Sequence, residues 1–582
     1  MLFITLILVT SSILVTTPVS LAFGAYAKAP ISPTGPTVSD ENLAVEKVVD
    51  GLDIPTSMAF LGPNDILVTE KETGKVKRII NGQIQETPLI DLDVATSIER
   101  GLLGIAVSKQ QQGEAGQPDG KTYVFLSYTE SGNDEDGSDL EDGAEPLGNR
   151  LYRYEYVDGK LVNPILLLDL TANPPNDRGE HNGGKIRIGP DNNVYFMVGE
   201  VGGHRTQAQN VADGPEPNGL GGVLRITQDG DVVNDDISPI FGDEIPLSLY
   251  YAMGIRNSFG MDFDPLTGNL WDTENGPDTG DEINLVFPGF NSGWVQVQGF
   301  MEDNLLTRDN APSLDDLVYF GKSKYADPKF AWEWPIGITA LKFLNSDKLG
   351  TEYQNDMFVG DINNGLLYRF TLNEARNNIV LDSTYSGNLQ ALEDNRIQNP
   401  KENLPLIFGQ GFGGITDIQV GPDGYLYILS YEGSLYKILP LSESTKNPIS
   451  GQSSNVPLYN EEGDDGNRLE VEDITGQSIG DDSNNNNRVN SIPVAIIGIN
   501  GSKSYSPDPI EIQEGQTVTW YNGDSISHTV TSGEDNGSDA GSGFDSDAII
   551  PNQYYSLTFD ESGDYKYYCI YHPSMVGEVI VE

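Results

Sequence analysis

The chain of 582 residues carries 87 Asp and Glu against 34 Lys and Arg, a formal net charge of −53 at pH 7. This charge argues against nucleic acid or an anionic membrane surface as a partner, because both would repel it. The length is typical of two to four domains. The 65 Gly and 27 Tyr, with few long apolar helical stretches, favour an all-β fold.

The N-terminal residues 1–27 are predicted to be a signal peptide. Residues 1–23 are apolar, and an Ala-x-Ala cleavage pattern follows near Ala25–Ala27. The alternative is an uncleaved N-terminal anchor, since a basic start is missing and the apolar run is nearly long enough to cross a bilayer. Either interpretation places the mature protein outside the cytoplasm, secreted or at the cell surface, with any membrane anchoring through the N-terminus only. Residues 28–44 are rich in Pro, Ser and Thr and are expected to form a flexible leader.

Residues 45–442 repeat one pattern, in which a turn of Gly, Asp, Asn or Pro joins two short β-rich runs. Examples are residues 65–76, 189–196, 264–271 and 421–428. Such turns between alternating strands signal β-hairpins. Because they recur without intervening linkers, they predict a β-propeller. A tandem of unrelated β-sandwiches is the alternative.

The composition changes after this region. Residues 443–490 consist mainly of Ser, Asn, Asp, Glu and Gly, and are predicted to form an acidic, disordered linker. Residues 491–582 return to short alternating runs, which predict a small β-sandwich. Its expected strands are Val494–Ile499, Pro509–Ile512, Thr517–Tyr521, Tyr554–Phe559, Gly563–Cys569 and Gly577–Val581.

This C-terminal region holds a set of soft metal ligands. Cys569, the only cysteine in the chain, is followed by His572 and Met575 with two residues in each gap, and His528 lies upstream. One thiolate, two imidazoles and a thioether are the ligands of a type 1 (blue) copper centre. A lone cysteine by itself is more often a buried, inert thiol. The spacing of the His and Met residues favours copper.

The same stretch resembles the cupredoxin family in several motifs. These are Tyr505-Ser506-Pro507, Glu514-Gly515, residues 518–522 (Val-Thr-Trp-Tyr-Asn) and His528-Thr529-Val530. The short Cys-x2-His-x2-Met loop is most similar to that of amicyanin, and plastocyanin has more residues before the Met. The resemblance implies electron transfer, with the edge of His572 as the exit for the electron.

Two clusters of the first region carry further chemistry. His181 precedes two glycines at the start of a strand, where an exposed imidazole can act as a general base. Arg256 can pair with an acidic cofactor. The acid- and Gly-rich turn at residues 272–284 offers carboxylates and free carbonyls, the oxygen ligands of Ca²⁺. A packed or surface histidine and a solvated acidic turn are the alternative interpretations.

Taken together, these stretches resemble the glucose/sorbosone dehydrogenase family. The matching residues are Glu99-Arg100-Gly101-Leu102-Leu103-Gly104-Ile105, Arg256-Asn257, Gly276-Pro277, residues 280–284, Gly293-Trp294 and Gly421-Pro422-Asp423-Gly424. The resemblance implies a six-bladed β-propeller that oxidises aldose sugars with pyrroloquinoline quinone (PQQ) and Ca²⁺.

The resemblance also implies roles for single residues. His181 would be the catalytic base. The cofactor-binding residues would be Glu99, Arg256 and Asn257. The carbonyls of Gly276 and Pro277 would hold the active-site Ca²⁺, and Glu282 would bind a second Ca²⁺ with the carbonyl of Ser292.

The chain departs from the family pattern at three places that meet the cofactor. Glu99 stands where the family has Gln, Asn363 lies near the place of a Lys, and residues 413–417 lack two Arg. PQQ is a tricarboxylate, and burying it requires cationic partners. Lys185 or Arg187 would have to replace them, or the propeller takes a different ligand.

We therefore expect an extracytoplasmic oxidoreductase that oxidises an aldose sugar or related alcohol at a PQQ–Ca²⁺ site. Electrons would pass to the tethered type 1 copper and on to a downstream redox partner protein. The alternative is a non-catalytic, Ca²⁺-stabilised propeller that binds a ligand and carries a cupredoxin electron-transfer domain.

Overall fold

The computed structural model describes most of residues 35–444 and the strand-forming parts of residues 491–581. The described ranges are 35–109, 120–133, 135–140, 145–173, 179–277, 280–301, 313–333, 335–381, 395–397, 403–444, 491–496, 504–506, 508–522, 528–533, 543–546, 549, 554–559, 562–570, 572 and 575–581. The expected signal peptide and nearly all of the expected linker lie outside these ranges. In the described part, no helix has the length and apolarity to cross a bilayer.

The described elements are β-strands and single-turn 3₁₀ helices, which confirms the all-β fold class. The first and second sheets follow each other in the chain. The first consists of β3 (Pro55–Gly62), β4 (Asp65–Glu70), β5 (Lys75–Ile80) and β6 (Gln83–Ile84), with β7 (Ile90–Asp91) on β5. The second consists of β8 (Leu102–Lys109), β9 (Thr122–Glu130), β10 (Gly148–Val157) and β11 (Lys160–Leu170).

The third and fourth sheets carry most of the candidate site. The third consists of β12 (Ile186–Ile188), β13 (Val194–Val198), β14 (Gly222–Ile226), β15 (Tyr250–Met253), β19 (Phe290–Asn291) and β20 (Lys324–Tyr325). The fourth consists of β16 (Ser258–Phe263), β17 (Leu270–Glu274), β18 (Asp281–Val286), β21 (Phe330–Trp332) and β26 (Arg396–Ile397).

The fifth and sixth sheets each include a strand from near the N-terminus. The fifth consists of β22 (Ile338–Phe343), β23 (Met357–Asp361), β24 (Leu367–Leu372), β27 (Ile407–Gln410) and β1 (Thr37–Val38), with β25 (Ile379–Val380) on β24. The sixth consists of β28 (Ile415–Val420), β29 (Leu426–Ser430), β30 (Leu435–Pro440) and β2 (Leu43–Val49).

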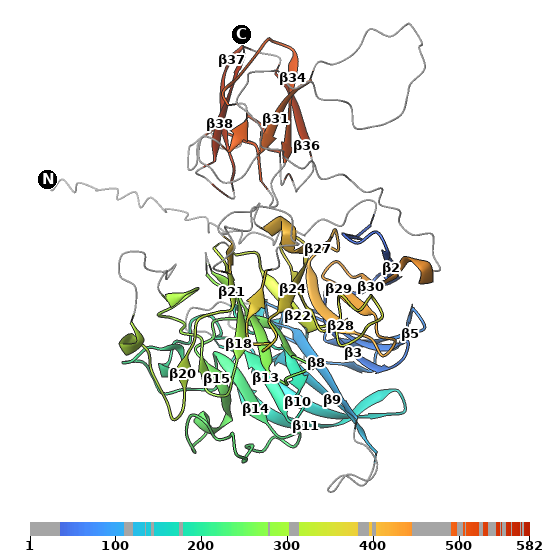
Figure 1. Cartoon of the computed structure of the whole chain (residues 1–582), viewed down its shortest axis with the longest axis vertical. Coiled ribbons are helices and arrows are strands. Elements are labelled where there is room, and N and C mark those ends of the chain that lie inside the picture. Colours follow the sequence, from blue (N-terminus) through green and yellow to red (C-terminus); the bar gives the residue numbers. More distant parts are fainter. Residues whose placement is uncertain are drawn as a thin grey trace, which may run out of the picture.

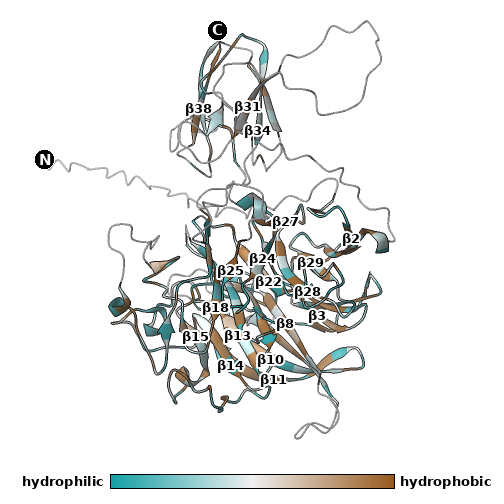
Figure 2. Ribbon diagram, viewed as in Figure 1, coloured by the Kyte–Doolittle hydropathy of each residue, from teal (hydrophilic) through white to brown (hydrophobic). Residues whose placement is uncertain are grey.

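One edge strand of each of these six sheets lies next to an edge strand of the following sheet, and these are the inner strands. β3 contacts β8, and contacts continue through β12, β16, β22 and β28 back to β3. Hydroxyl groups join neighbouring sheets at this inner position. Thr56 Oγ1 donates to the Leu102 carbonyl at 2.7 Å, and Thr416 Oγ1 donates to the Pro55 carbonyl at 2.8 Å. The inner strands are therefore joined by side-chain hydrogen bonds, and Figure 2 shows brown, hydrophobic residues along many strands of these sheets.

The prediction of a flexible leader over residues 28–44 is wrong for its last residues, because Thr37–Val38 and Leu43–Ala44 belong to strands. β1 pairs with β27, and β2 pairs antiparallel with β30, Leu43 opposite Pro440 and Ala44 opposite Leu439. The blue β2 lies beside the orange β30 in Figure 1. Leu43 and Ala44 are buried, so the apolar start of this segment outweighs the Pro- and Thr-rich composition around it. The chain thus closes its last sheet with one of its earliest strands.

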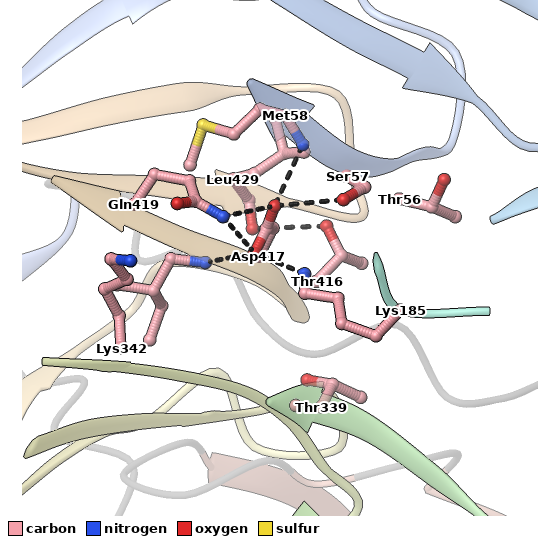
Figure 3. Close-up of polar contacts among 12 residues, drawn as sticks. Thr56, Ser57, Met58, Lys185, Thr339, Lys342, Thr416, Asp417, Gln419 and Leu429 are labelled. Atoms are coloured by element: carbon pink, nitrogen blue, oxygen red, sulfur yellow. Dashed lines mark hydrogen bonds and ion pairs between the residues drawn. The ribbon is translucent and has the colours of Figure 1, made fainter. Parts of the chain in front are cut away.

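A buried ionic cluster lies among the inner strands (Figure 3). Asp417 of β28 accepts hydrogen bonds from Ser57 Oγ and Met58 N of β3, and pairs with Lys185 Nζ at 2.5 Å. Arg187 of β12 approaches Asp417 and Asp262, and Lys342 pairs with Asp262 at 2.9 Å. These contacts join the inner strands of the first, third, fourth, fifth and sixth sheets.

The C-terminal region forms two four-stranded sheets over one core. One contains β32 (Tyr505–Ser506), β31 (Ser491–Ile496), β34 (Gln516–Asn522) and β36 (Tyr554–Phe559). The other contains β33 (Ile510–Ile512), β38 (Val576–Val581), β37 (Gly563–Tyr568) and β35 (Thr531–Ser532). Apolar residues of both sheets, including Trp520 and Val579, form a single cluster. This confirms the predicted β-sandwich and all six of its expected strands, to within a few residues at each end.

Candidate active site and metal centre

His181 stands at the entry to β12 in a conformation that is unusual for histidine. Its φ of 60° lies in the left-handed region, and Gly183 and Gly184 follow with φ of 65° and 104°. Non-glycine residues held there often mark functional sites. The backbone is also crowded, since a Cβ on Gly199 would lie 2.2 Å from the His181 carbonyl oxygen. The glycines around His181 therefore fix the position of its backbone, from which the imidazole extends.

Glu200 orients the imidazole of His181. His181 Nδ1 lies 3.1 Å from Glu200 Oε1, and Trp294 Nε1 donates to Glu200 Oε2 at 2.9 Å. Burial raises the pKa of Glu200, but the hydrogen bonds from His181 and Trp294 more than offset it and leave the pKa below its ordinary value. A charged carboxylate only accepts hydrogen bonds, so Nδ1 carries the proton and the lone pair lies on Nε2. This is the tautomer that a general base requires.

Glu99 connects the three strand entries of the site. Its Oε2 accepts hydrogen bonds from the backbone N–H groups of His181 and Asn182, at 2.6 Å and 3.2 Å. Asn257 Nδ2 lies 3.2 Å from both carboxylate oxygens. Glu99 precedes β8, His181 precedes β12, and Asn257 precedes β16, so one side chain joins three neighbouring sheets.

Arg256 contacts the predicted calcium-binding turn. Its NH1 donates to the carbonyls of Asn275 and Gly276, at 3.0 Å and 2.9 Å. The guanidinium also lies 5.5 Å from the ring centre of Trp294. Arg256 Nε and Asn257 Oδ1 are buried and have no hydrogen-bond partner. These two atoms offer one donor and one acceptor to a ligand.

The calcium ligands predicted from the sequence lie close to this cluster: Gly276 and Pro277 in the turn after β17, Glu282 on β18, and Ser292 directly after β19. Glu274 Oε1 accepts from Arg256 N, and Glu274 Oε2 accepts from Ser292 Oγ at 2.6 Å. Glu282 Oε1 accepts from Gln298 Nε2 and the Gly299 backbone. Burial raises the pKa of both Glu274 and Glu282. Neighbouring buried carboxylates of this kind suit a divalent cation.

The copper ligands predicted from the sequence come together in the C-terminal sandwich. Among the described residues, His528, Cys569 and His572 are the one group of three or more His, Cys, Asp or Glu whose ligand atoms all lie within 4.8 Å of one another. Cys569 Sγ lies 3.8 Å from His528 Nδ1 and 3.5 Å from His572 Nδ1. Met575 is fully buried in the same core cluster as Cys569.

Backbone hydrogen bonds hold these ligands in place. His572 N donates to the Cys569 carbonyl, and Met575 N donates to the His572 carbonyl, so the three ligands are linked through backbone hydrogen bonds. His528 is paired with Ile549 in an isolated bridge, and Asn522 Nδ2 donates to the Ile549 carbonyl at 2.7 Å. Burial raises the pKa of the Cys569 thiol, but hydrogen bonds from both histidines and from Thr529 N lower it to about 6. The thiolate, which is the metal ligand, is therefore favoured at neutral pH.

Comparisons with known proteins agree with these two sites. A family model described as glucose/sorbosone dehydrogenase matches residues 52–437, well over half of the chain. The chain belongs to the glucose/sorbosone dehydrogenase family. A second model, of copper-binding proteins of the plastocyanin/azurin family, matches residues 494–582. Both resemblances seen in the sequence are confirmed.

Relatives of each part are known. Quinoprotein glucose dehydrogenase B of Acinetobacter calcoaceticus is 28% identical over 70% of this chain and 90% of its own length. An aldose sugar dehydrogenase of Escherichia coli is 26% identical over 68% of this chain and 92% of its own length. The C-terminal part is 39% identical to amicyanin of Paracoccus versutus over 15% of this chain and 64% of that protein. This member of the glucose/sorbosone dehydrogenase family is thus a dehydrogenase-type enzyme joined to a copper-binding domain.

The cations expected to replace the family's missing Lys and Arg are already engaged. Lys185 pairs with Asp417, which lies in the stretch where the family has its two Arg. Arg187 faces Asp262 and Asp417, and Asn363 is exposed. In this glucose/sorbosone dehydrogenase, the positive charges of Lys185 and Arg187 are therefore balanced by the negative charges of Asp417 and Asp262. Of the predicted cofactor residues, Arg256 remains the cation directed at the site.

Sequence reasoning missed three residues of the site, namely Glu200, Trp294 and Glu274. Glu200 follows β13 and Trp294 follows β19. Glu200 contacts His181, and Trp294 contacts Glu200, each from another strand of the third sheet. Trp294 stands in a motif of the family, which indicated that it lies near the site but not that it contacts Glu200. Glu274 immediately precedes the Asn-Gly-Pro turn, and its position at a strand end was the available signal for it.

Proposed function

We propose that this protein is an extracytoplasmic dehydrogenase that oxidises an aldose sugar or a related alcohol with PQQ and Ca²⁺. The electrons pass to the tethered type 1 copper domain and then to a separate redox partner protein. The observation that carries the proposal is the His181–Glu200 pair, a base fixed in its active tautomer beside Arg256 and Asn257. Its setting is a six-bladed propeller, which the six sheets and the contacts between their inner strands support.

The residues around His181 suit a hydroxyl substrate. His181 Nε2 can take the proton of the sugar hydroxyl, while Glu200 stabilises the imidazolium that results. Glu99 holds the His181 and Asn182 backbone and so keeps the base in place. Trp294 donates a hydrogen bond to the carboxylate of Glu200 and stabilises its negative charge. The contact between His181 and Glu200 therefore does not need water to stabilise the carboxylate.

Arg256 Nε and Asn257 Oδ1, which have no hydrogen-bond partner, suit PQQ, and the carbonyl and carboxylate oxygens around the turn after β17 suit calcium. Arg256 and Asn257 would contact the quinone, and the carbonyls of Gly276 and Pro277 would hold the active-site calcium. Glu282, with the Ser292 carbonyl, would hold a second calcium. When bound, PQQ supplies a two-electron acceptor for the hydrogen on the carbinol carbon. Glu99 places a negative charge beside these groups and weakens binding of a tricarboxylate.

The copper half of the proposal rests on the ligand set itself. His528, Cys569, His572 and Met575 would hold copper, which supplies a one-electron carrier. His528 is fully buried and His572 is partly exposed, so the His572 ring is the part of the site nearest to solvent. It is therefore the place for electron exit.

One experiment with the full chain tests both halves. The protein is loaded with Cu²⁺, PQQ and Ca²⁺ and then mixed with aldoses. We expect an intense blue colour that fades on addition of sugar, and reduction of an artificial dye. His181→Ala should lower sugar-dependent turnover at least 100-fold and leave the blue colour, because the base contributes about 10²–10⁴-fold. Cys569→Ser should abolish the colour and leave dye reduction.

His204→Ala is the matched control, because His204 is the other histidine of the region and its ring contacts the Asn173 carbonyl. Its backbone N–H donates to the Glu200 carbonyl, and the alanine variant keeps that hydrogen bond. It should keep both activities. Sugar oxidation that survives His181→Ala would refute the catalytic assignment. A blue protein without any sugar oxidation would favour the alternative, a non-catalytic propeller that binds a ligand.

A further inference from the structure

Arg205 differs from most arginines of the described residues in how its side chain is used. Arg78 and Arg225 donate hydrogen bonds to carboxylates, and Arg256 donates to carbonyls of the turn after β17. The guanidinium of Arg205 donates no hydrogen bond to the part of the chain that the structure describes, and 52% of its side-chain surface is exposed. Its donors therefore remain available to a ligand.

Arg205 lies on the ring of Trp294, next to the His181–Glu200 pair. Its guanidinium carbon is 5.7 Å from the ring centre of Trp294, and its Nε is 4.0 Å from Glu200 Oε2. Glu200 contacts His181 through its other oxygen. A separation of 4.0 Å is too long for a hydrogen bond, so Glu200 attracts the cation without occupying its donors. Arg205 is thus a cation placed two contacts away from the base.

Trp294 also carries a second guanidinium. Arg256 lies 5.5 Å from the same ring centre, and Trp294 itself is only 4% exposed. The indole N–H donates to Glu200, which fixes the orientation of the ring. A cation over an aromatic face is attracted by the negative charge of that face. One buried ring therefore holds two guanidinium groups, of which Arg205 is the one that reaches solvent.

The backbone before Arg205 is tied to that of His181. In the turn after β13, Val201 N donates to the His181 carbonyl at 3.1 Å, and His204 N donates to the Glu200 carbonyl at 3.0 Å. The side chain of Arg205 therefore starts from a hydrogen-bonded turn, and its ring contact and its backbone both place it at the site.

The surroundings of Arg205 are acidic, which limits the ligand that it can take. Asp and Glu outnumber Lys and Arg by 87 to 34 in the chain, so an arginine without a hydrogen-bonded carboxylate is an exception. A guanidinium offers a planar fork of donors that matches a carboxylate. A phosphate brings up to two negative charges and would be repelled more strongly by Glu200. A single carboxylate therefore suits this position best.

We propose that Arg205 binds a carboxylate of a ligand that lies against His181. The inference rests on the proposed function for the position of the active site, and adds to it a group that recognises negative charge. Two ligands could bring the carboxylate. One is the substrate, which would then be a sugar acid with a hydroxyl for His181. The other is PQQ, which lacks the cationic partners expected near Asn363 and residues 413–417.

The test measures binding in the full chain without turnover, because Arg205 also lies near Glu200 and a change in rate alone would not identify a carboxylate. Calcium-loaded wild-type protein and Arg205→Gln are titrated in a calorimeter with PQQ alone and, without PQQ, with glucuronate and with glucose. Glucose is the neutral counterpart of glucuronate. Arg205→Gln should bind one of the two carboxylates about 10-fold more weakly and leave the affinity for glucose unchanged.

Arg78→Gln is the matched control. Arg78 also lies over an aromatic ring, 5.6 Å from the ring centre of Tyr156, but its guanidinium is already paired with Asp65 at 2.7 Å. This variant should bind PQQ, glucuronate and glucose as the wild type does. Weaker binding of glucuronate in Arg205→Gln identifies a sugar acid as the source of the carboxylate, and weaker binding of PQQ identifies the cofactor.

A second variant separates charge from shape. Arg205→Lys keeps the positive charge but not the planar fork, so its affinity for the carboxylate should lie between those of the wild type and Arg205→Gln. Equal affinities of Arg205→Gln and the wild type for both ligands, or a wild type that binds neither, would overturn the proposal. Absence of sugar oxidation in a protein that binds the carboxylate through Arg205 would instead count against the proposed function.

Discussion

Glu99 holds the residues of the site in place by hydrogen bonds, and its negative charge repels the expected cofactor. Its carboxylate holds the backbone of His181 and Asn182 and the amide of Asn257. Glutamine, the residue that the family resemblance implies here, can accept the backbone hydrogen bonds with its single carbonyl oxygen. The additional negative charge is therefore not needed for the architecture.

Glu99→Gln should consequently raise the affinity for PQQ. Removing one like charge beside a tricarboxylate is worth roughly 1.5–3 kcal/mol, about 10- to 100-fold in Kd. Titration of the calcium-loaded protein with PQQ measures the change. Glu72→Gln is the control, because Glu72 is half-exposed and contacts Lys71 instead of the His181 cluster. An unchanged or weaker affinity in Glu99→Gln would show that the carboxylate does not face the cofactor.

The residues of the site were predictable where a local motif carried them. His181, Arg256, Asn257 and the copper ligands stand in short, recognisable patterns. The partners that orient them were not, because those contacts join distant parts of the chain. Lys185 and Asp417 are 232 positions apart, and Asn257 and Glu99 are 158 apart. Whether Lys185 was free for a ligand depended on a neighbour that no motif names.

At the level of elements, Asp361 at the end of β23 predicts how the stability of the protein depends on pH. Burial raises the pKa of Asp361 to about 7 from an ordinary 3.8, although hydrogen bonds from Asn364 N, Tyr368 Oη and Gly365 N partly offset it. Between about pH 4 and pH 7, Asp361 is therefore protonated in the folded state and ionised in the unfolded state. Stability from this group is highest at low pH and falls as pH rises through this window.

Asp361→Asn should remove that decline, because the amide does not ionise. The free energy of unfolding of the variant, relative to the wild type, should increase by roughly 1–4 kcal/mol from pH 4 to pH 8. Denaturant titrations at several pH values measure it. A difference that stays constant with pH would mean that Asp361 is ionised in the folded protein throughout this range.

Most strands could be predicted because hairpin turns have a local chemistry. The turns at residues 189–193, 264–269 and 421–424 each join the two strands expected around them. β1, β32 and β35 were missed, since two residues are too few to show alternation. β2 was placed partly in a leader because its partner, β30, lies at the other end of the region.

For the whole molecule, the covalent connection between the two domains predicts how electron transfer depends on concentration. The flexible linker predicted for residues 443–490 would raise the effective concentration of one domain near the other to about millimolar. Fading of the blue colour after addition of sugar should then follow a rate independent of protein concentration in the micromolar range. Separately expressed halves, residues 28–444 and 491–582, should react at a rate proportional to concentration. Concentration-dependent fading in the intact chain would show that electrons move between molecules.

The pairing of β2 with β30 has a consequence for how the protein is made. The sixth sheet cannot be completed until residues 435–440 have left the ribosome, although β2 emerges early. At about 5–20 residues per second, β2 waits tens of seconds with an unpaired edge. During that time it is open to mispairing with other strands or to capture by a chaperone. The copper-binding sandwich is synthesised only afterwards, so its strands appear when the edge of β30 already has a partner.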